Sequence, residues 1–322
     1  MKNVRRFAFL MVFIMLAVAA VGCGQAAPDD DTIYISIATG SPAGTYYPLG
    51  AAVAQVLNDN IEGISAQAES TGASLANITL LHDRENELAL VQNDITYYAF
   101  NGVEMYEDAV PHDYLRGVAT WYPEIIQIVA SADSGIETID DLVGKNVAVG
   151  APGSGTEANA RQILLAHDIT YEDLGKADYL TFSEAADNIK DGHIDAAFLT
   201  AGIPTAVVQD ISTVKDVQLI SFDEAKLDAF LDEYPFYTKA VIPAGTYPNQ
   251  DEPVTGVAVM AMLITHSEVD EDLFYEITKA IFENLDTIAA AHVRGGDLQL
   301  ETAMDGMPIE LHPGVQRFYD EQ

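Results

Sequence analysis

Residues 38–50 read ATGSPAGTYYPLG and join a short β-branched stretch to an apolar stretch with helical spacing. A strand is expected to end at Ala38 and a helix to begin near Thr45, with Gly40 and Gly44 freeing the backbone of the turn between them. Free N–H groups at such a helix start favour an anion. A tight turn without a ligand is the plainer alternative, and the spacing does not match the G-x-G-x-x-G fingerprint of dinucleotide sites.

Four later segments join a strand pattern to a helix pattern in the same way: STGASLAN (70–77), QND (92–94), GAPGSGTE (150–157) and AGIPT (201–205). Taken singly, each is more often a helix cap than a ligand site. Together, the five junctions would line a cleft with neutral donors. The candidate ligand contacts are Thr39, Gly40, Gly44, Tyr46, Ser74, Asn77, Gln92, Asp94, Ser154, Gly155, Thr156 and Thr205. Among them, Asp94 would pair with a ligand ammonium group.

Strand and helix patterns alternate along the rest of the chain. Strands are expected at 32–38, 65–69, 88–92, 117–121, 125–131, 146–150, 179–182, 196–199, 217–222 and 254–265. Helices are expected at 46–57, 74–81, 94–100, 139–143, 156–166, 271–282 and 284–293. This alternation predicts an α/β fold with parallel sheets and crossover helices.

The length of 322 residues is sufficient for two lobes, each with its own core. We expect lobe one to comprise residues 32–123 plus 254–322 and lobe two to comprise residues 124–253. The ligand cleft would then lie between the lobes, at the carboxyl ends of strands.

The N-terminus has the pattern of an export signal. Lys2, Arg5 and Arg6 precede an unbroken apolar run over residues 7–21. This run is shorter than the roughly 20 residues that cross a bilayer, so a permanent membrane span is the weaker interpretation.

The end of the apolar run reads AVGC and is similar to the lipobox of bacterial lipoproteins. Residues 1–22 would then be a signal peptide, Cys23 would carry the lipid, and residues 23–31 would form a flexible tether. A plain secretory peptide with an incidental cysteine is the alternative. Because Cys23 is the only cysteine, the chain forms no intramolecular disulfide.

The chain is strongly acidic, with 15 Lys and Arg against 50 Asp and Glu. Removing residues 1–22 takes away three basic residues and no acids, which leaves a net charge of −38. Such a surface repels phosphate backbones, so nucleic acid is not an expected partner. The acids are scattered, as on a solvated surface, and both a salt-rich habitat and an ordinary acidic exported protein fit them.

Enzyme signatures are absent or broken. There is no H-E-x-x-H, Walker loop or C-x-x-C, and Pro152 breaks a G-x-S-x-G pattern around Ser154. His193 next to Asp195 follows a helix-ending glycine and fits a surface turn. No enzyme activity, cofactor or metal is therefore expected. Tyr46, Tyr47, Trp121 and Tyr122 belong either to the core or to a surface that stacks on a ligand.

The chain from residue 33 onward resembles the TAXI family of solute receptors of tripartite ATP-independent periplasmic (TRAP) transporters. The blocks that carry the resemblance are ATGSPAGTYYPLG, STGASLANITLL, LALVQND, DSGIETIDDLVGKNVAVGAPGSGTE, DGHIDAAFLTAGIPT, PAGTY and LHPGVQRFY. The family usually has glycine where this chain has Ala73, and glycines are common where it has Ser41, Pro42 and Ala43.

The resemblance implies a type II periplasmic-binding-protein fold and transfer of a small carboxylate or an amino acid such as glutamate to a TRAP permease. We expect a monomer outside the cytoplasm, anchored to the membrane by lipid, whose lobes close on the ligand about a hinge. A lipid-anchored sensor that feeds a signalling partner is the alternative.

Overall fold

The structure is a computed structural model that describes residues 32–322. Tyr34–Gln322 forms one compact unit. The predicted signal peptide, Cys23 and the tether lie outside the described residues. None of the helices in the described part of the chain has the length and hydropathy that a membrane crossing requires.

The described residues alternate between strands and helices, as the sequence patterns predict. The strands are β1 (Ile33–Ala38), β2 (Ile64–Glu69), β3 (Leu88–Gln92), β4 (Leu115–Ser131), β5 (Asn146–Ala148), β6 (Lys176–Asp178), β7 (Ala196–Ala201), β8 (Val217–Ile220), β9 (Thr238–Ile242) and β10 (Val254–His266). The α-helices are α2 (Tyr46–Asn60), α3 (Ser74–His82), α4 (Asn93–Asn101), α5 (Gly155–Ala166), α6 (Phe182–Asp191), α7 (Ala206–Ser212), α8 (Glu224–Glu233), α9 (Glu271–Glu283), α10 (Leu285–Ala291) and α11 (Pro313–Asp320). Short 3₁₀ turns are η1 (Glu104–Tyr106), η2 (Ile139–Leu142) and η3 (Val293–Asp297).

The strands form one mixed sheet in the order β2-β1-β3-β10-β4-β7-β5-β6, with β8 paired to β4 and β9 paired to β10. The outer pairs β1 and β3, β5 and β7, and β5 and β6 are parallel. The expectation of parallel sheets is wrong for the centre, where β10 runs antiparallel to β3 and β4. The reason is that β4 and β10 carry the chain in opposite directions, one away from the N-terminal half and the other back to it.

The two central strands are long and continuous. Residues 117–121 and 125–131 were expected to be separate strands, but both belong to β4, and Pro123 is an exposed position within it. Pro123 lies opposite Met260, and the register between β4 and β10 shifts just beyond this pair. A proline is tolerated at such an irregularity because the ladder there does not need its missing N–H.

The buried apolar residues cluster on either side of this irregular point. One set of clusters belongs to β1, β3, the start of β4 and the end of β10, with α2, α3, α4 and α9; we call this region lobe one. The other belongs to the end of β4, β5, β7 and the start of β10, with α5, α6, α7 and α8; we call it lobe two. The predicted boundaries stay a prediction, because β4 and β10 belong to both regions.

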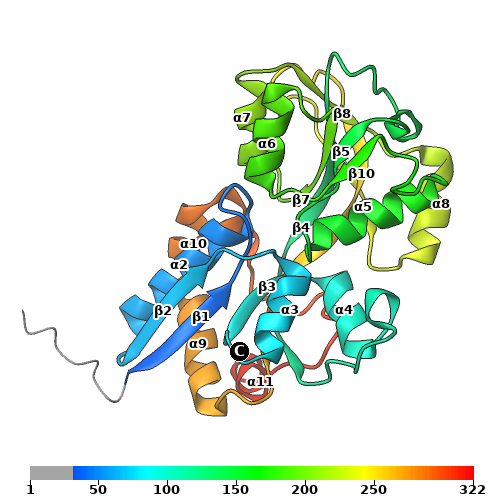
Figure 1. Cartoon of the computed structure of the whole chain (residues 1–322). Helices are drawn as coiled ribbons and strands as arrows, with labels where there is room; N and C mark the ends of the chain where they lie inside the picture. Colours follow the sequence, from blue (N-terminus) through cyan, green and yellow to red (C-terminus); the bar gives the residue numbers. More distant parts are fainter. Residues whose placement is uncertain (1–31) are drawn as a thin grey trace, which may run out of the picture. The chain divides into compact units, whose positions relative to one another are not determined.

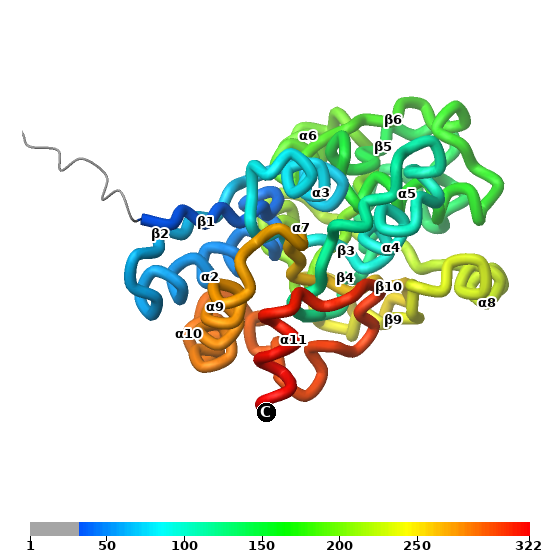
Figure 2. The backbone as a smooth tube through the Cα atoms, turned by 90° about the horizontal axis from the view of Figure 1, so that it is seen from below, coloured from blue at the N-terminus to red at the C-terminus, as the bar shows by residue number. Residues whose placement is uncertain are grey.

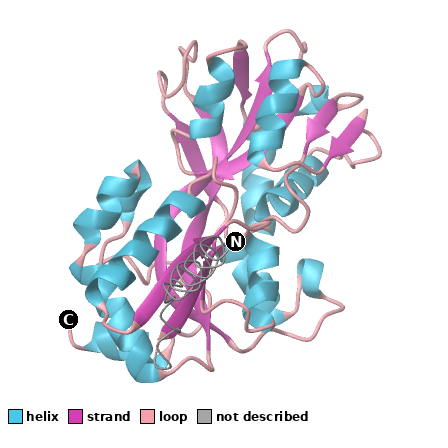
Figure 3. Cartoon of the chain, turned by 60° about the vertical axis from the view of Figure 1, so that its left-hand side comes forward, coloured by secondary structure: helices cyan, strands magenta, loops and turns pink. Residues whose placement is uncertain are grey.

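Helices cover the sheet in each lobe. In Figure 1, lobe one contains the blue, cyan and orange elements, and lobe two contains the green and yellow ones. Helices α2, α9 and α10 gather on one side of lobe one, and α11 packs on α9 (Figure 2). Figure 3 shows the strands running through the middle with helices on both sides.

The strand expected over residues 179–182 is wrong. The strand β6 ends at Asp178, and a helix begins at Phe182. Thr181 and Glu184 form a reciprocal capping box that starts α6, since each side chain bonds the other residue's backbone N–H. The helix then ends at Gly192, which has a left-handed conformation with φ of 74°.

Candidate functional site

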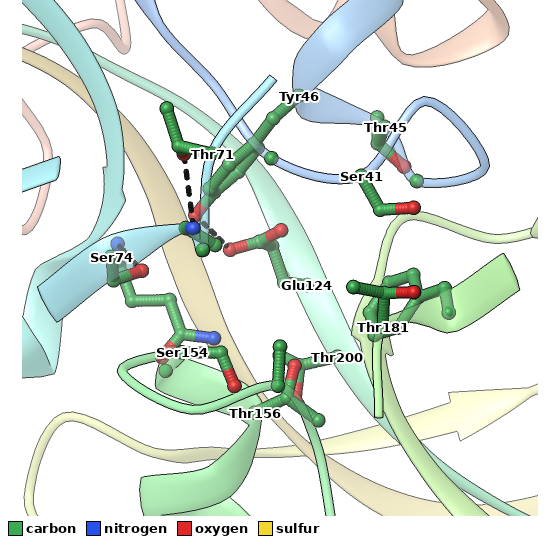
Figure 4. Close-up of a pocket in the computed structure, with 18 residues that line it drawn as sticks. Ser41, Thr45, Tyr46, Thr71, Ser74, Glu124, Ser154, Thr156, Thr181 and Thr200 are labelled. Atoms are coloured by element: carbon green, nitrogen blue, oxygen red, sulfur yellow. Dashed lines mark hydrogen bonds between the residues drawn. The ribbon is translucent and has the colours of Figure 1, made fainter. Parts of the chain in front are cut away.

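A pocket of about 520 Å³, including open solvent at its mouth, lies between the two lobes. Figure 4 shows Thr45, Tyr46 and Thr71 on one side, Ser154, Thr156 and Thr181 on the other, and Glu124 between them. The lining residues are Gly40, Ser41, Gly44, Thr45, Tyr46, Thr71, Gly72, Ala73, Ser74, Gln92, Glu124, Ala151, Ser154, Gly155, Thr156, Thr181, Phe182 and Thr200.

Four helices begin at the wall of this pocket: α2 and α3 from lobe one, and α5 and α6 from lobe two. The first turn of an α-helix has N–H groups without partners inside the helix, and its dipole places partial positive charge there. The convergence of four such helix starts makes the pocket favourable for an anion.

The pocket lining within residues 32–322 contains an acidic side chain but no basic one. Among the described residues that line the pocket, none is Lys, Arg or His, and Glu124 is the only acid. An anion held here would therefore depend on backbone N–H groups, hydroxyls and amides rather than on an ion pair.

Glu124 comes from the middle of β4 and is only 2% exposed. One carboxyl oxygen accepts a hydrogen bond of 2.6 Å from the hydroxyl of Tyr46, and the other accepts one of 3.3 Å from the hydroxyl of Tyr122. Burial raises the pKa of Glu124 to about 8, against the lowering effect of the two phenols. The carboxyl group therefore tends to be neutral at neutral pH.

The start of α3 has an unusual backbone. Ala73 precedes the helix with φ of 71° and ψ of −147°, in a region that strongly favours glycine. Its N–H donates to the hydroxyl of Thr71 (3.0 Å), and that hydroxyl donates to Asn77 (2.5 Å). The strained turn, which lines the pocket, is held in place by these bonds.

The start of α5 is closely packed against lobe one. Ser154 caps the helix by accepting a hydrogen bond from the N–H of Glu157 (3.1 Å). A Cβ atom at position 155 would overlap the side-chain amide of Gln92, so a larger residue there would displace that amide. Gln92 also donates to Asn159 of α5 (3.0 Å), which joins the two lobes beside the pocket.

Most of the residues expected from the strand-to-helix junctions line this pocket, from both lobes. They are Gly40, Gly44, Tyr46, Ser74, Gln92, Ser154, Gly155 and Thr156. The other four expected residues, Thr39, Asn77, Asp94 and Thr205, are buried but do not line it.

Two of these four hold the turns of lobe one together. The hydroxyl of Thr39 donates to the carbonyl of Glu69 (2.5 Å). Asn77 donates from its amide nitrogen to the carbonyls of Thr39 and Leu90, both at 2.7 Å. The side chains of Thr39 and Asn77 therefore donate to backbone carbonyls, and Asn77 also accepts from the hydroxyl of Thr71.

Asp94 and Thr205 are bonded within the protein. Asp94 accepts from Asn159 (3.2 Å), and burial raises its pKa to about 7. Thr205 accepts from Gln127 (2.7 Å), and its N–H donates to the hydroxyl of Tyr247 (2.8 Å). The polar atoms of Thr205 are therefore used within the protein, whereas the second carboxyl oxygen of Asp94 is buried without a hydrogen-bond partner, so a direct role of Asp94 stays a prediction.

Several lining residues escaped the sequence analysis, namely Glu124, Thr181, Phe182 and Thr200. Thr181 had a readable signal, because T-F-S-E at residues 181–184 has the capping-box spacing. The sequence also shows that Glu124 is an acidic residue within an apolar stretch. Neither signal shows which residues the folded chain brings to one pocket. Among residues 32–322, no group of His, Cys, Asp and Glu is arranged to hold a metal ion.

Solved structures similar to this chain include the binding component of a transporter. PhnD1 from Prochlorococcus marinus, in complex with methylphosphonate, has a TM-score of 0.56 and 9% identity over 83% of this chain and 91% of that chain. The binding component of an ABC phosphonate transporter from Pseudomonas aeruginosa has a TM-score of 0.52 and 10% identity, over 83% and 80%. A structure from work on glutathione import by Streptococcus mutans has a TM-score of 0.50 and 14% identity, over 86% and 100%.

At these identities the similarity establishes the fold, which is the predicted α/β fold of two-lobed, type II periplasmic binding proteins. A sequence profile gives the family. The profile of the NMT1-like family matches residues 37–322, which is nearly all of the described chain. The chain therefore belongs to the NMT1-like family.

Proposed function

We propose that this protein is an extracytoplasmic receptor that captures a small organic anion in the pocket between its lobes and delivers it to a membrane transporter. The observation that carries the proposal is the convergence of four helix starts on a pocket whose lining contains no basic side chain. Carboxylates, sulfonates and phosphonates are small anions that suit such N–H groups and hydroxyls.

The position of the pocket supports a mechanism in which the two lobes close on the ligand. Its wall combines Tyr46 and Ser74 of lobe one with Ser154 and Thr181 of lobe two, so one ligand would bond to both lobes. Within residues 32–322, β4 and β10 are the strands that run through both lobes in the middle of the sheet, and their register shifts at the crossing. A ligand that contacts both lobes only in the closed form would shift the population toward that form.

For the transporter, we propose a TRAP permease, on the strength of the sequence blocks that resemble TAXI receptors. The alternative partner is an ABC transporter, because the similar structure from Pseudomonas aeruginosa is the binding component of one. The two partners differ in energy source. Uptake reconstituted with the cognate permease should run on an imposed ion gradient without ATP, and a strict requirement for ATP would contradict the TRAP assignment.

We further propose that Cys23 anchors the protein to a membrane through a lipid. Detergent phase separation of the full-length protein expressed in a bacterium would place wild type in the detergent phase and Cys23→Ser in the aqueous phase. If both forms stay in the aqueous phase, the anchor proposal is wrong.

Ligand capture is tested with four probes: succinate, L-glutamate, methanesulfonate and methylphosphonate. A probe at about 100 times its dissociation constant should stabilise the protein by about 2.7 kcal/mol and raise its melting temperature. Small-angle scattering should show a smaller radius of gyration with that probe bound. If none of the four raises the melting temperature at millimolar concentration, the proposed ligand class is wrong.

Two matched variants connect binding to the pocket. Ser154→Ala should weaken binding of the active probe by about 1–3 kcal/mol, because a buried ligand oxygen would lose its partner. Ser183→Ala changes an exposed serine that is not a lining residue and should leave binding unchanged. Equal effects of the two variants would place the ligand elsewhere.

A further inference from the structure

The buried carboxyl group of Glu124 is at odds with a pocket that favours anions. Glu124 lines the same pocket as the four helix starts and is 2% exposed. If Glu124 were ionised, a bound anion would face a second negative charge a short distance away, in surroundings where water screens poorly. The structure must remove this repulsion for an anion to bind.

The neighbours of Glu124 do not supply a compensating cation. The hydroxyls of Tyr46 on α2 and Tyr122 on β4 donate to it, and Asp94 on α4 is a second buried acid that disfavours its charge. The nearby cation is Arg294 of η3, which acts on Tyr122 and already pairs with Asp297 at 2.9 Å. Its guanidinium group also donates to the carbonyl of Ile203 at 2.8 Å.

We propose that Glu124 is the neutral acid when the pocket holds an anion, and that its O–H donates a hydrogen bond to the ligand. This inference rests on the proposed function. One proton then accompanies the anion, and it is taken from solvent at any pH where the empty pocket has lost it. Glu124 would thus be the only donor from an acidic side chain in a wall otherwise made of backbone N–H groups, hydroxyls and an amide.

The geometry of the carboxyl group leaves a place for this proton. The short bond of 2.6 Å from Tyr46 occupies one oxygen as an acceptor. The bond from Tyr122 to the other oxygen is longer, at 3.3 Å, so that oxygen is the more weakly held of the two. A proton on the weakly held oxygen can be donated to a ligand, while Tyr46 keeps the group in place.

The chemistry predicts a clear pH dependence. Burial raises the pKa of Glu124 to about 8, and an anion in the pocket raises it further. Binding should be independent of pH well below 8 and weaken above it, because the proton must first be regained. For a probe that does not titrate in this range, the dissociation constant should rise about tenfold between pH 7 and pH 9.

The first measurement needs no ligand. The infrared difference spectrum of wild type minus Glu124→Gln at pH 7 should contain the carbonyl band of a protonated carboxylic acid, because the contribution of Asp94 is common to both proteins, and this difference band should disappear as pH rises past about 8. Absence of this band would overturn the proposal. Circular dichroism and melting curves establish that Glu124→Gln is folded.

The second measurement is calorimetry with succinate, methanesulfonate and L-glutamate from pH 7 to pH 9. Wild type should lose about tenfold in affinity for succinate or methanesulfonate, whereas Glu124→Gln should change less than about twofold because its amide is always neutral and always a donor. In wild type above pH 8, the binding heat should depend on the ionisation enthalpy of the buffer, which shows proton uptake. Asp94→Asn is a comparison variant, since Asp94 does not line the pocket: it should keep a pH dependence, with the loss of affinity beginning at a lower pH, because removal of the Asp94 charge lowers the pKa of Glu124.

Four results of this calorimetry would overturn the proposal, and they are distinguishable. Equal pH dependence in wild type and Glu124→Gln would assign the proton to another group. Loss of L-glutamate binding in Glu124→Gln, with wild-type affinity for L-glutamate rising with pH, would mean that Glu124 is ionised and pairs with an ammonium group. If none of the three probes binds to wild type, the proposed ligand class is wrong, and so is the donor role of Glu124. If a probe binds without pH dependence, the donor role is wrong but the proposed ligand class is not contradicted.

Discussion

The two walls of the pocket begin their helices in different ways. In lobe two, the N-cap residues Ser154 and Thr181 each accept a hydrogen bond from a first-turn N–H of their own helix. In lobe one, the N-cap residues Thr45 and Ala73 make no such side-chain bond. Lobe two therefore satisfies one N–H of each helix start through its own caps. In lobe one, the N–H of Ala76 in α3 instead donates to the carbonyl of Gly153 from lobe two (3.1 Å), and α2 has Pro48, which has no N–H, at its third position.

The difference extends to charge and strain. The lobe-one wall contains Ala73, with its glycine-like backbone, and Tyr46, which bonds the buried acid Glu124. The lobe-two wall contributes capped helix starts and the hydroxyls of Thr156 and Thr200. We infer that lobe two is a preformed half-site and that the energetic costs of the pocket are concentrated on the lobe-one side.

The largest expected effect concerns Glu124 and pH. Its folded-state pKa of about 8 lies above the ordinary value of 4.5, so the folded protein binds more protons between these values and its stability falls as pH rises through that window. Relative to wild type, Glu124→Gln should gain about 3–5 kcal/mol of unfolding free energy at pH 9 and almost none at pH 4. Urea denaturation at the two pH values measures this, and an equal gain at both would show that Glu124 does not titrate in this way.

The next effect concerns the contact between the walls. In Gly155→Ala, the added Cβ overlaps the side-chain amide of Gln92, so either this amide or the α5 start must shift. We expect binding of the active probe to weaken by about 2 kcal/mol, in line with other overpacked sites. Gly296→Ala is the control, because its Cβ would meet only Ala289 at an ordinary distance of 3.8 Å. Calorimetry on both variants measures this change in affinity. Unchanged binding in Gly155→Ala would mean that the close contact between position 155 and Gln92 is not required for binding.

A smaller effect tests the caps of lobe two directly. Thr181→Ala should lower the unfolding free energy by about 1 kcal/mol, because it removes the acceptor for the N–H of Glu184 and breaks the capping box. The neighbouring Ser183→Ala leaves the cap intact and should change stability by only a few tenths of a kcal/mol. If chemical denaturation shows the same unfolding free energy for these two variants, the capping box of Thr181 does not stabilise the protein measurably. The difference in caps between the two walls would then have no effect on stability.

The smallest effect concerns strain in lobe one. Ala73→Gly should stabilise the protein by about 0.5 kcal/mol, because relief of the strained backbone slightly exceeds the added entropy of glycine in the unfolded chain. Ala76→Gly, inside α3, should instead destabilise it by about 1 kcal/mol. Equal destabilisation in both variants would mean that Ala73 is not strained.

Much of the local structure could be predicted because its causes are local. The strand Leu88–Gln92 and the starts of the helices at Tyr46 and Ser74 have the predicted positions, since apolar periodicity and turn residues specify them over a few residues. The same reasoning failed at residues 179–182, where a β-rich composition concealed a capping box. It also failed at β4, where the presence of Pro123 does not end the strand.

The candidate site could be predicted only in part. The junction patterns named Ser154, Gly155 and Thr156, but the same patterns also named Thr205, which bonds Gln127 instead. A helix cap has the same sequence whether it faces a ligand pocket or the interior, because the signal comes from the cap itself.

The sequence by itself determined most of the alternation of strands and helices, the glycine and hydroxyl chemistry at their junctions, and the acidic charge. Only the tertiary structure decided which helix starts meet, because that depends on β4 and β10 crossing between the lobes in opposite directions. It also decided that Glu124 is buried between Tyr46 and Tyr122, residues 78 and two positions away along the chain. Burial and proximity of this kind arise from long-range packing, which leaves no periodic signal in a single sequence.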